Sequence, residues 1–273
     1  MKKILGLTTA IILLLACNNS SNQQSETEVK QASVKAQKPT KQEQFIRSIE
    51  TAHHAEAYND KELIQFDFNL IFGGKQRFQG IVTMSPNGGI VRMQDSTKTM
   101  IWDGEMAYLS PADIDYSKTR FDVLTWSYFF AAPYKLDDPG TKHELLGNKN
   151  LNGQAFSAMK LTFKNGVGDS PDDWYVVYQD QETDLLAAMA YVVTYSKSLD
   201  QAEEDPHAIT YEAYDEVDGI PFATQWNFWA WNEEGELNKL LGEAQISNIQ
   251  FIKKADDLFK APANSRKVEK PAA

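Results

Sequence analysis

Four histidines are the side chains of this chain best suited to acid–base or metal chemistry. His53 and His54 are adjacent in a segment expected to be helical, so they point about 100° apart and cannot easily bind one metal ion. His143 and His207 are isolated, and the His-Glu-x-x-His pattern is absent. We therefore expect His53 to be a half-buried packing residue rather than a metal ligand or a general base.

An acidic cluster is the next candidate. Asp169, Asp172 and Asp173 lie in a glycine-containing segment that could hold calcium, but the ligand spacing of an EF-hand is absent. The pattern favours a solvated turn there, and a surface loop at 203–205. A Gly-x-Ser-x-Gly nucleophile elbow is also absent. We expect no catalytic residue, no bound metal and no cofactor, and hence a protein that is not an enzyme.

The remaining reactive side chain is Cys17, the only cysteine of the chain. Lys2 and Lys3 precede an apolar run over 4–15, and Ala16 supplies a small residue just before the cysteine. This order is typical of a secretory signal peptide. It resembles the lipobox of bacterial lipoproteins, in which the thiol is diacylated and becomes the new N-terminus. The resemblance implies lipidation at Cys17 and membrane attachment through its acyl chains.

Composition limits the other partners. The chain has 27 Lys and Arg against 38 Asp and Glu, a net charge of −11. An acidic surface repels phosphate backbones, so nucleic acid is not expected to bind. No second apolar stretch reaches the roughly 20 residues of a spanning helix. Asn18 follows the lipidated position, and in this respect the sequence resembles lipoproteins that are carried to the outer membrane. We expect a lipid-anchored envelope protein on the periplasmic or surface face of the outer membrane.

Composition also divides the chain into four parts. Residues 1–17 are the predicted signal peptide. Residues 18–39 are rich in Asn, Ser, Gln and Lys and cannot bury enough apolar surface to fold, which predicts a flexible tether. A folded domain is expected over 40–260, and a loose tail over 261–273.

Hydrophobic spacing predicts the elements of the folded domain. Thr40 and Glu43 form a capping box, and the helix that they start is expected to end near Ala57. From Leu63 the apolar period changes to two, and about ten strands with short turns follow. A second helix is expected over 119–132. It is apolar nearly all round, so both of its sides need cover.

The order of these elements predicts the fold class. Strand–helix alternation is absent, which argues against a parallel sheet. The expected fold is mainly β (α+β): a curled antiparallel sheet or half-barrel of about ten strands, with an N-terminal helix and an inserted covering helix.

Two strand segments, 185–195 and 226–231, are apolar on both faces, whereas a sheet with one wet face should alternate. Either both faces carry a packed core, or the sheet and the 119–132 helix enclose a cleft for an apolar ligand. The same residue types serve both arrangements. The candidates for ligand contact are Phe66, Phe68, Trp126, Phe129, Phe130, Met189, Tyr191, Trp226 and Phe228.

The layout over 40–260 resembles the lipoprotein-localisation factors LolA and LolB. Two phrases add to the resemblance: Tyr178-Gln179-Asp180 before Thr183-Asp184-Leu185-Leu186, and Val217-Asp218-Gly219-Ile220-Pro221. The family implies a half-barrel that encloses an apolar cavity under helices, and a role in lipid or lipoprotein handling. A lipidated terminus looks more like LolB than like soluble LolA. The loops at 165–173 and 201–206 depart from the family layout.

Three functions remain open at this point. The first is an anchored, non-enzymatic protein that binds a lipid or the acyl chains of another lipoprotein. The second is an envelope scaffold with an acidic β-surface and a solid interior. The third is a surface hydrolase or sugar-binding protein in which an exposed Trp229 or Trp231 is a stacking platform.

Overall fold

A computed structural model of the chain describes residues 38–270. The predicted signal peptide, Cys17 and nearly all of the predicted tether lie outside the described residues. Residues from Pro39 onward form one unit by themselves. None of the helices within 38–270 combines the length and the apolar character needed to cross a membrane.

Thirteen strands form one antiparallel sheet in the order β13-β5-β4-β3-β2-β1-β12-β11-β10-β9-β8-β7-β6. Within the described residues the two end strands do not pair with each other, so the sheet is open. The bounds of the strands are β1 (Leu63–Phe72), β2 (Lys75–Met84), β3 (Val91–Asp95), β4 (Thr99–Trp102), β5 (Ala107–Ser110), β6 (Thr141–Leu151), β7 (Gln154–Phe163), β8 (Tyr175–Gln179), β9 (Leu186–Tyr191), β10 (His207–Val217), β11 (Ile220–Trp231), β12 (Leu237–Ile252) and β13 (Arg266–Val268).

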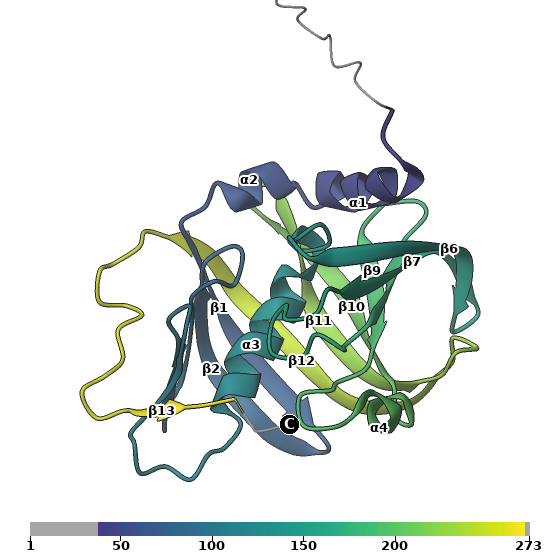
Figure 1. Ribbon diagram of the computed structural model, residues 1–273. Helices are drawn as coiled ribbons and strands as arrows, with labels where there is room; N and C mark the ends of the chain where they lie inside the picture. Colours follow the sequence, from purple (N-terminus) through teal and green to yellow (C-terminus); the bar gives the residue numbers. More distant parts are fainter. Residues whose placement is uncertain (1–37, 271–273) are drawn as a thin grey trace, which may run out of the picture. The chain divides into compact units, whose positions relative to one another are not determined.

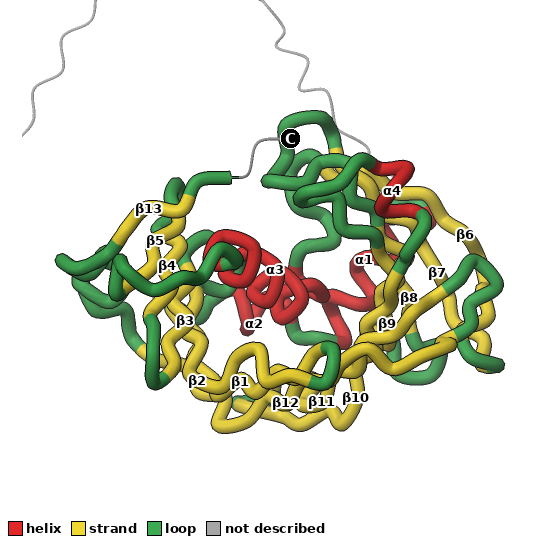
Figure 2. The backbone as a smooth tube through the Cα atoms, turned by 90° about the horizontal axis from the view of Figure 1, so that it is seen from below, coloured by secondary structure: helices red, strands yellow, loops and turns green. Residues whose placement is uncertain are grey.

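The sheet curls around a helix. Figure 2 shows α3 (Thr119–Ala131) lying on the concave side of a U-shaped sheet. The helices α1 (Lys41–Ala52) and α2 (Ala55–Asn59) lie across one end of the curl (Figure 1). This open, mainly β half-barrel with an N-terminal helix and an inserted helix confirms the expected fold class. The sheet has more strands than the ten or so expected.

The N-terminal helix begins as its sequence predicts. The amide of Glu43 donates to Oγ1 of Thr40, and the amide of Thr40 donates to the Glu43 carboxylate, which completes the capping box. The helix ends earlier than expected because His54 adopts a left-handed conformation, with φ of 52°. A second short helix, α2, follows this break.

Three further details differ from the sequence predictions. Arg266–Val268 is β13, paired with β5, so this part of the expected loose tail is ordered. The strand expected over 185–196 ends at Tyr191. The acidic run expected to be a loop starts inside a short helix, α4 (Leu199–Glu203), whose Glu203 accepts a hydrogen bond from Nε1 of Trp174.

Both faces of the sheet carry apolar cores. The larger core fills the concave face against α3, where the rings of Phe66 and Phe130 stack at 4.1 Å. A smaller core lies on the other face of β8 and β9, around Tyr178 and Trp231. The turns β6–β7 and β11–β12 meet beside it, since the amide of Asn152 donates to the carbonyl of Gly235 across 2.7 Å.

Candidate ligand-binding cavity

The apolar helix α3 has two different sides. Its Val123 and Phe130 are buried in the large core, as a helix that covers a sheet requires. Phe121, Leu124 and Tyr128 recur at helical spacing and border a cavity instead. The helix α3 is therefore covered by a packed core on one side and borders a cavity on the other.

The cavity has a volume of about 400 Å³. It lies between α3, the strands β7 to β9, and the loops that precede β6 and β8. Its walls are largely aromatic: Tyr128 lies 5.2 Å from Tyr175, Tyr175 lies 6.2 Å from Tyr191, and Phe163 meets Tyr175 edge-on. The interior between sheet and helix is thus not filled solid.

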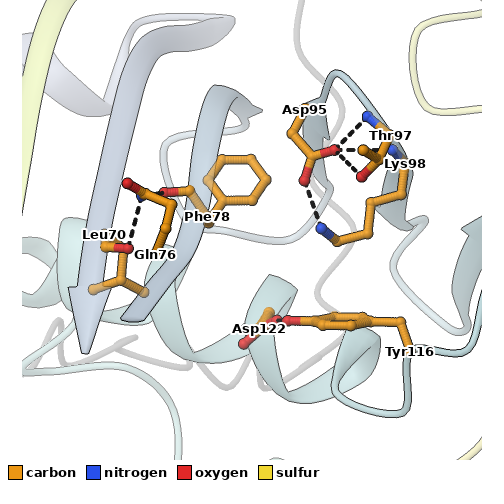
Figure 3. A network of polar contacts seen from close by, with 8 residues as sticks. All are labelled: Leu70, Gln76, Phe78, Asp95, Thr97, Lys98, Tyr116 and Asp122. Carbon is orange, nitrogen blue, oxygen red and sulfur yellow. Dashed lines mark hydrogen bonds and ion pairs between the residues drawn. The ribbon is translucent and has the colours of Figure 1, made fainter. Parts of the chain in front are cut away.

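A polar network fixes the beginning of α3. Asp122 is buried and accepts hydrogen bonds from the hydroxyl of Tyr116 and, at 3.1 Å, from Nε1 of Trp126. Burial raises the pKa of Asp122, although these two hydrogen bonds oppose the rise. Lys98 lies between the carboxylate of Asp95 and the ring of Tyr116, 4.8 Å from the ring centre (Figure 3). The helix that lines the cavity is therefore tied to the β3–β4 turn.

An ion pair joins α3 to the loop before β8. The guanidinium of Arg120 donates to both oxygens of Asp169, at 2.5 and 3.0 Å, and lies 4.8 Å from the ring centre of Trp102. This bidentate geometry is the strong form of an arginine–carboxylate pair. On another edge of the cavity, Lys135 pairs with Asp138 and donates to the carbonyl of Asn87. Lys135, the cation in the cavity lining, is thus paired with a carboxylate, and the lining carboxylate of Asp169 is paired with Arg120.

Burial alters the acid–base chemistry of Asp173, a carboxylate of the cavity lining. One carboxylate oxygen accepts from both the amide and the hydroxyl of Thr194, each at 2.7 Å. Burial raises the pKa of Asp173 to about 6, against the opposing effect of the Thr194 hydrogen bonds. None of the ion pairs found within residues 38–270 includes Asp173.

The residues proposed from sequence for ligand contact divide into two groups. Phe129 and Tyr191 border the cavity and contact each other at 5.0 Å. The other seven pack in or against the large core and do not border the cavity: Phe66, Phe68, Trp126, Phe130, Met189, Trp226 and Phe228. Sequence reasoning missed Leu124, Tyr128 and Tyr175, of which the first two share the apolar stripe of α3.

The acidic cluster does not form a metal site. Asp169 is engaged by Arg120 and Asp173 by Thr194, while Asp172 is exposed. No group of three or more metal-ligating side chains comes together anywhere in the described part of the chain. The segment is also not a solvated turn throughout, because Asp169 and Asp173 border the cavity.

The histidine and tryptophan candidates have structural surroundings. His53 is fully buried, more deeply than the half-buried packing position expected, and accepts a hydrogen bond from the amide of Leu186. His143 lies 2.7 Å from the carbonyl of Leu136. Trp231 is only 7% exposed, and Trp229 is half-buried with its indole N–H donating to Thr210. Neither tryptophan is the exposed stacking platform that a sugar-binding surface needs.

No family model matches the sequence, and neither does any curated protein. Several solved structures do match. A LolA superfamily protein from Nitrosomonas europaea has a TM-score of 0.53 at 10% identity, over 81% of this chain and 98% of that one. A DUF1329 family protein from Desulfovibrio piger has a TM-score of 0.43 at 14% identity, over 78% of this chain and 96% of that one. An outer membrane lipoprotein-sorting protein domain from Vibrio parahaemolyticus has a TM-score of 0.43 at 10% identity, over 79% of this chain and 97% of that one. The first likeness shows that the chain has a LolA-like fold, as the sequence layout predicts.

Proposed function

We propose that this protein is a lipid-anchored, non-enzymatic component of the bacterial cell envelope that binds an apolar ligand between α3 and β7–β9. The ligand is a lipid or the acyl chains of another lipoprotein. The observation that carries the proposal is the cavity of about 400 Å³ with largely aromatic walls. Its size falls within the roughly 300–1,000 Å³ of small-molecule pockets.

The lining favours apolar ligands over water. Leu124, Phe163 and Val193 offer water no hydrogen-bonding partner, so an acyl chain that replaces water at these side chains gains the hydrophobic free energy of its own buried surface. An apolar cavity in a half-barrel under a helix is also what the LolA/LolB resemblance implies.

Binding is tested with the chain from Asn18 onward, which keeps every described residue. We expect the neutral dye N-phenyl-1-naphthylamine to bind with a rise in fluorescence. Leu124→Trp adds an indole to the cavity wall and should reduce the affinity at least tenfold. Leu240→Trp adds the same indole at an exposed position of β12 and is the control. A dye that binds both variants equally well would contradict the cavity as its site.

Anchoring at Cys17 is tested in the full chain. The lipobox pattern predicts that cells fed an alkynyl palmitate analogue incorporate it into the protein, and that Cys17→Ala abolishes incorporation. Fractionation should place the labelled protein in the outer membrane, and Asn18→Asp should shift it toward the inner membrane. Label retained in Cys17→Ala would exclude lipidation at this residue.

A further inference from the structure

Three of the four tyrosines in the cavity lining, all except the partly buried Tyr195, give it a polar feature that a site for bare hydrocarbon does not need. Tyr128 on α3, Tyr175 on β8 and Tyr191 on β9 all belong to the lining. Tyr175 is 8% exposed and Tyr191 is 5% exposed. Their hydroxyls make no hydrogen bond to any other described residue. The fully enclosed polar atoms without a partner within residues 38–270 are in His53, Thr119, Trp226 and Trp231, so the three tyrosine hydroxyls are not fully enclosed. These hydroxyls are therefore reached from the cavity.

The other buried tyrosines near α3 behave differently. The hydroxyl of Tyr58 donates to Pro86, that of Tyr134 to His53, that of Tyr211 to Phe129 and that of Tyr214 to Leu186, each through a backbone carbonyl. Buried hydroxyls are normally paired in this way, because a missing partner costs free energy. The three cavity hydroxyls have their bonding capacity left for a bound molecule.

The charged residues around the cavity further limit the class of ligand that it can bind. Lys135 in the lining is paired with Asp138, and Arg120 behind the lining is paired with Asp169, so neither cation is left to hold an anionic headgroup. The remaining charged group is the Asp173 carboxylate, which repels anions and accepts hydrogen bonds. Burial raises the pKa of Tyr175 and of Tyr191, so both hydroxyls stay protonated and can donate.

We propose that the cavity selects uncharged amphiphiles whose ester or hydroxyl oxygens bond to Tyr128, Tyr175 and Tyr191, over anionic lipids and bare hydrocarbon. This inference rests on the proposed function and names the ligand class of the same site. Glyceryl esters have this chemistry: ester oxygens accept from the tyrosines, a hydroxyl donates to Asp173, and the chain contacts the aromatic wall. A free glyceride and the diacylglyceryl group of a lipoprotein share it.

The test compares ligands of equal chain length by displacement of N-phenyl-1-naphthylamine. At pH 8 we expect monolauroylglycerol to displace the dye at least tenfold more effectively than laurate does. Tyr175→Phe and Tyr191→Phe keep the ring but remove the hydroxyl. Each should weaken monolauroylglycerol about tenfold, as the loss of one well-formed hydrogen bond does, and change dye affinity less than twofold.

Tyr178→Phe is the matched control, because it makes the same change on the same strand but lies in the core of the opposite face. It should leave both affinities unchanged. A diacylglyceryl-cysteine peptide in a further arm separates the two sources: tighter binding than a diacylglycerol points to lipoproteins, weaker binding to free glycerides. Either result supports recognition of the glyceryl ester only if Tyr175→Phe and Tyr191→Phe weaken the binding of that ligand.

The outcomes separate this inference from the proposed function. The inference is overturned if the dye binds but laurate displaces it as effectively as monolauroylglycerol does. It is also overturned if the Tyr→Phe variants weaken the binding of dye and glyceride equally. In both cases the hydroxyls line the cavity without recognising the ligand. If neither the dye nor any amphiphile binds the native chain, the proposed function falls and the inference with it. Tyr191→Phe decides the question should Tyr175→Phe fail to fold.

Discussion

The backbone amide of Leu186 donates a hydrogen bond to Nε2 of His53 across 3.0 Å. This bond ties the end of α1 to the start of β9, and the imidazole lies edge-on to the rings of Tyr134 and Tyr214. A ring nitrogen accepts only when it carries no proton. Burial favours the same state and lowers the pKa of His53 to about 3.

This relationship predicts acid sensitivity. The pKa of His53 is about 6.5 in the unfolded chain and lower in the folded one, so between these values the unfolded chain binds more protons. The free energy of unfolding should therefore decrease as the pH falls from about 6.5, by at most about 1.4 kcal/mol per pH unit. His53→Gln keeps an acceptor for Leu186 and should remove this slope in urea titrations. The exposed His54→Gln should retain it.

Asp173 predicts a pH dependence of opposite sign. Its folded pKa of about 6 lies above the usual value for an aspartate, so the folded chain binds more protons between about 4 and 6. Its ionisation destabilises the fold as the pH rises through this window. Asp173→Asn, whose amide oxygen can still accept from Thr194, should raise the free energy of unfolding at pH 8 by about 1–2 kcal/mol.

The comparison at pH 4 is the internal control for Asp173, because there the native carboxyl is already protonated. The gain from Asp173→Asn should then be small. The exposed neighbour Asp172→Asn should change stability little at either pH. An equal gain at pH 4 and pH 8 would show that the effect of Asp173→Asn is not electrostatic.

The Arg120–Asp169 pair predicts local loosening on mutation. Both side chains are largely buried, and removal of one partner leaves the other charge uncompensated. We expect Asp169→Asn to cost about 1–3 kcal/mol and to raise hydrogen exchange over the loop before β8. Asp218→Asn breaks an exposed pair with Lys61 and should cost less than about 0.5 kcal/mol. Unchanged exchange in Asp169→Asn would mean that the pair does not hold this loop.

Much of the fold follows from local patterns. The capping box at Thr40, the period-two strands and the all-round apolar helix are short-range signals, and each has its counterpart in the structure. The short strand β13 is different, since Arg266-Lys267-Val268 has no strand pattern of its own. It is a strand because it pairs with β5, a tertiary effect that period and composition do not encode.

Strand β9 shows how a bulge alters a prediction made from alternation. Strict alternation places Leu186 and Met189 on opposite faces. In the structure Leu186 pairs with Gln179 and Ala188 with Tyr178, so Ala187 is an extra residue. Leu186 and Met189 consequently share the large core, while Ala188 and Ala190 face the smaller one. One inserted residue thus changes which side chains face α3.

The cavity itself was only half predictable. The apolar character of both faces indicated either a core or a cleft, and the structure contains both. Which aromatic residues fill space and which border it depends on where α3 lies within the curl. That position is set by contacts distant in sequence, such as Arg120 with Asp169 and the hydroxyl of Tyr211 with the carbonyl of Phe129. Alternation and composition carry no information on these contacts.

The meeting of the two turns beside the smaller core gives a last prediction. Gly235 has φ of 82°, and a Cβ added there would lie 2.0 Å from the carbonyl oxygen of Asn150. Gly219 has φ of 76° with open space around its Cβ position. Gly235→Ala should therefore cost about 2–4 kcal/mol, and Gly219→Ala only the roughly 1 kcal/mol of a left-handed alanine. Chemical unfolding measures both, and equal costs would show that the turns yield easily to a methyl group.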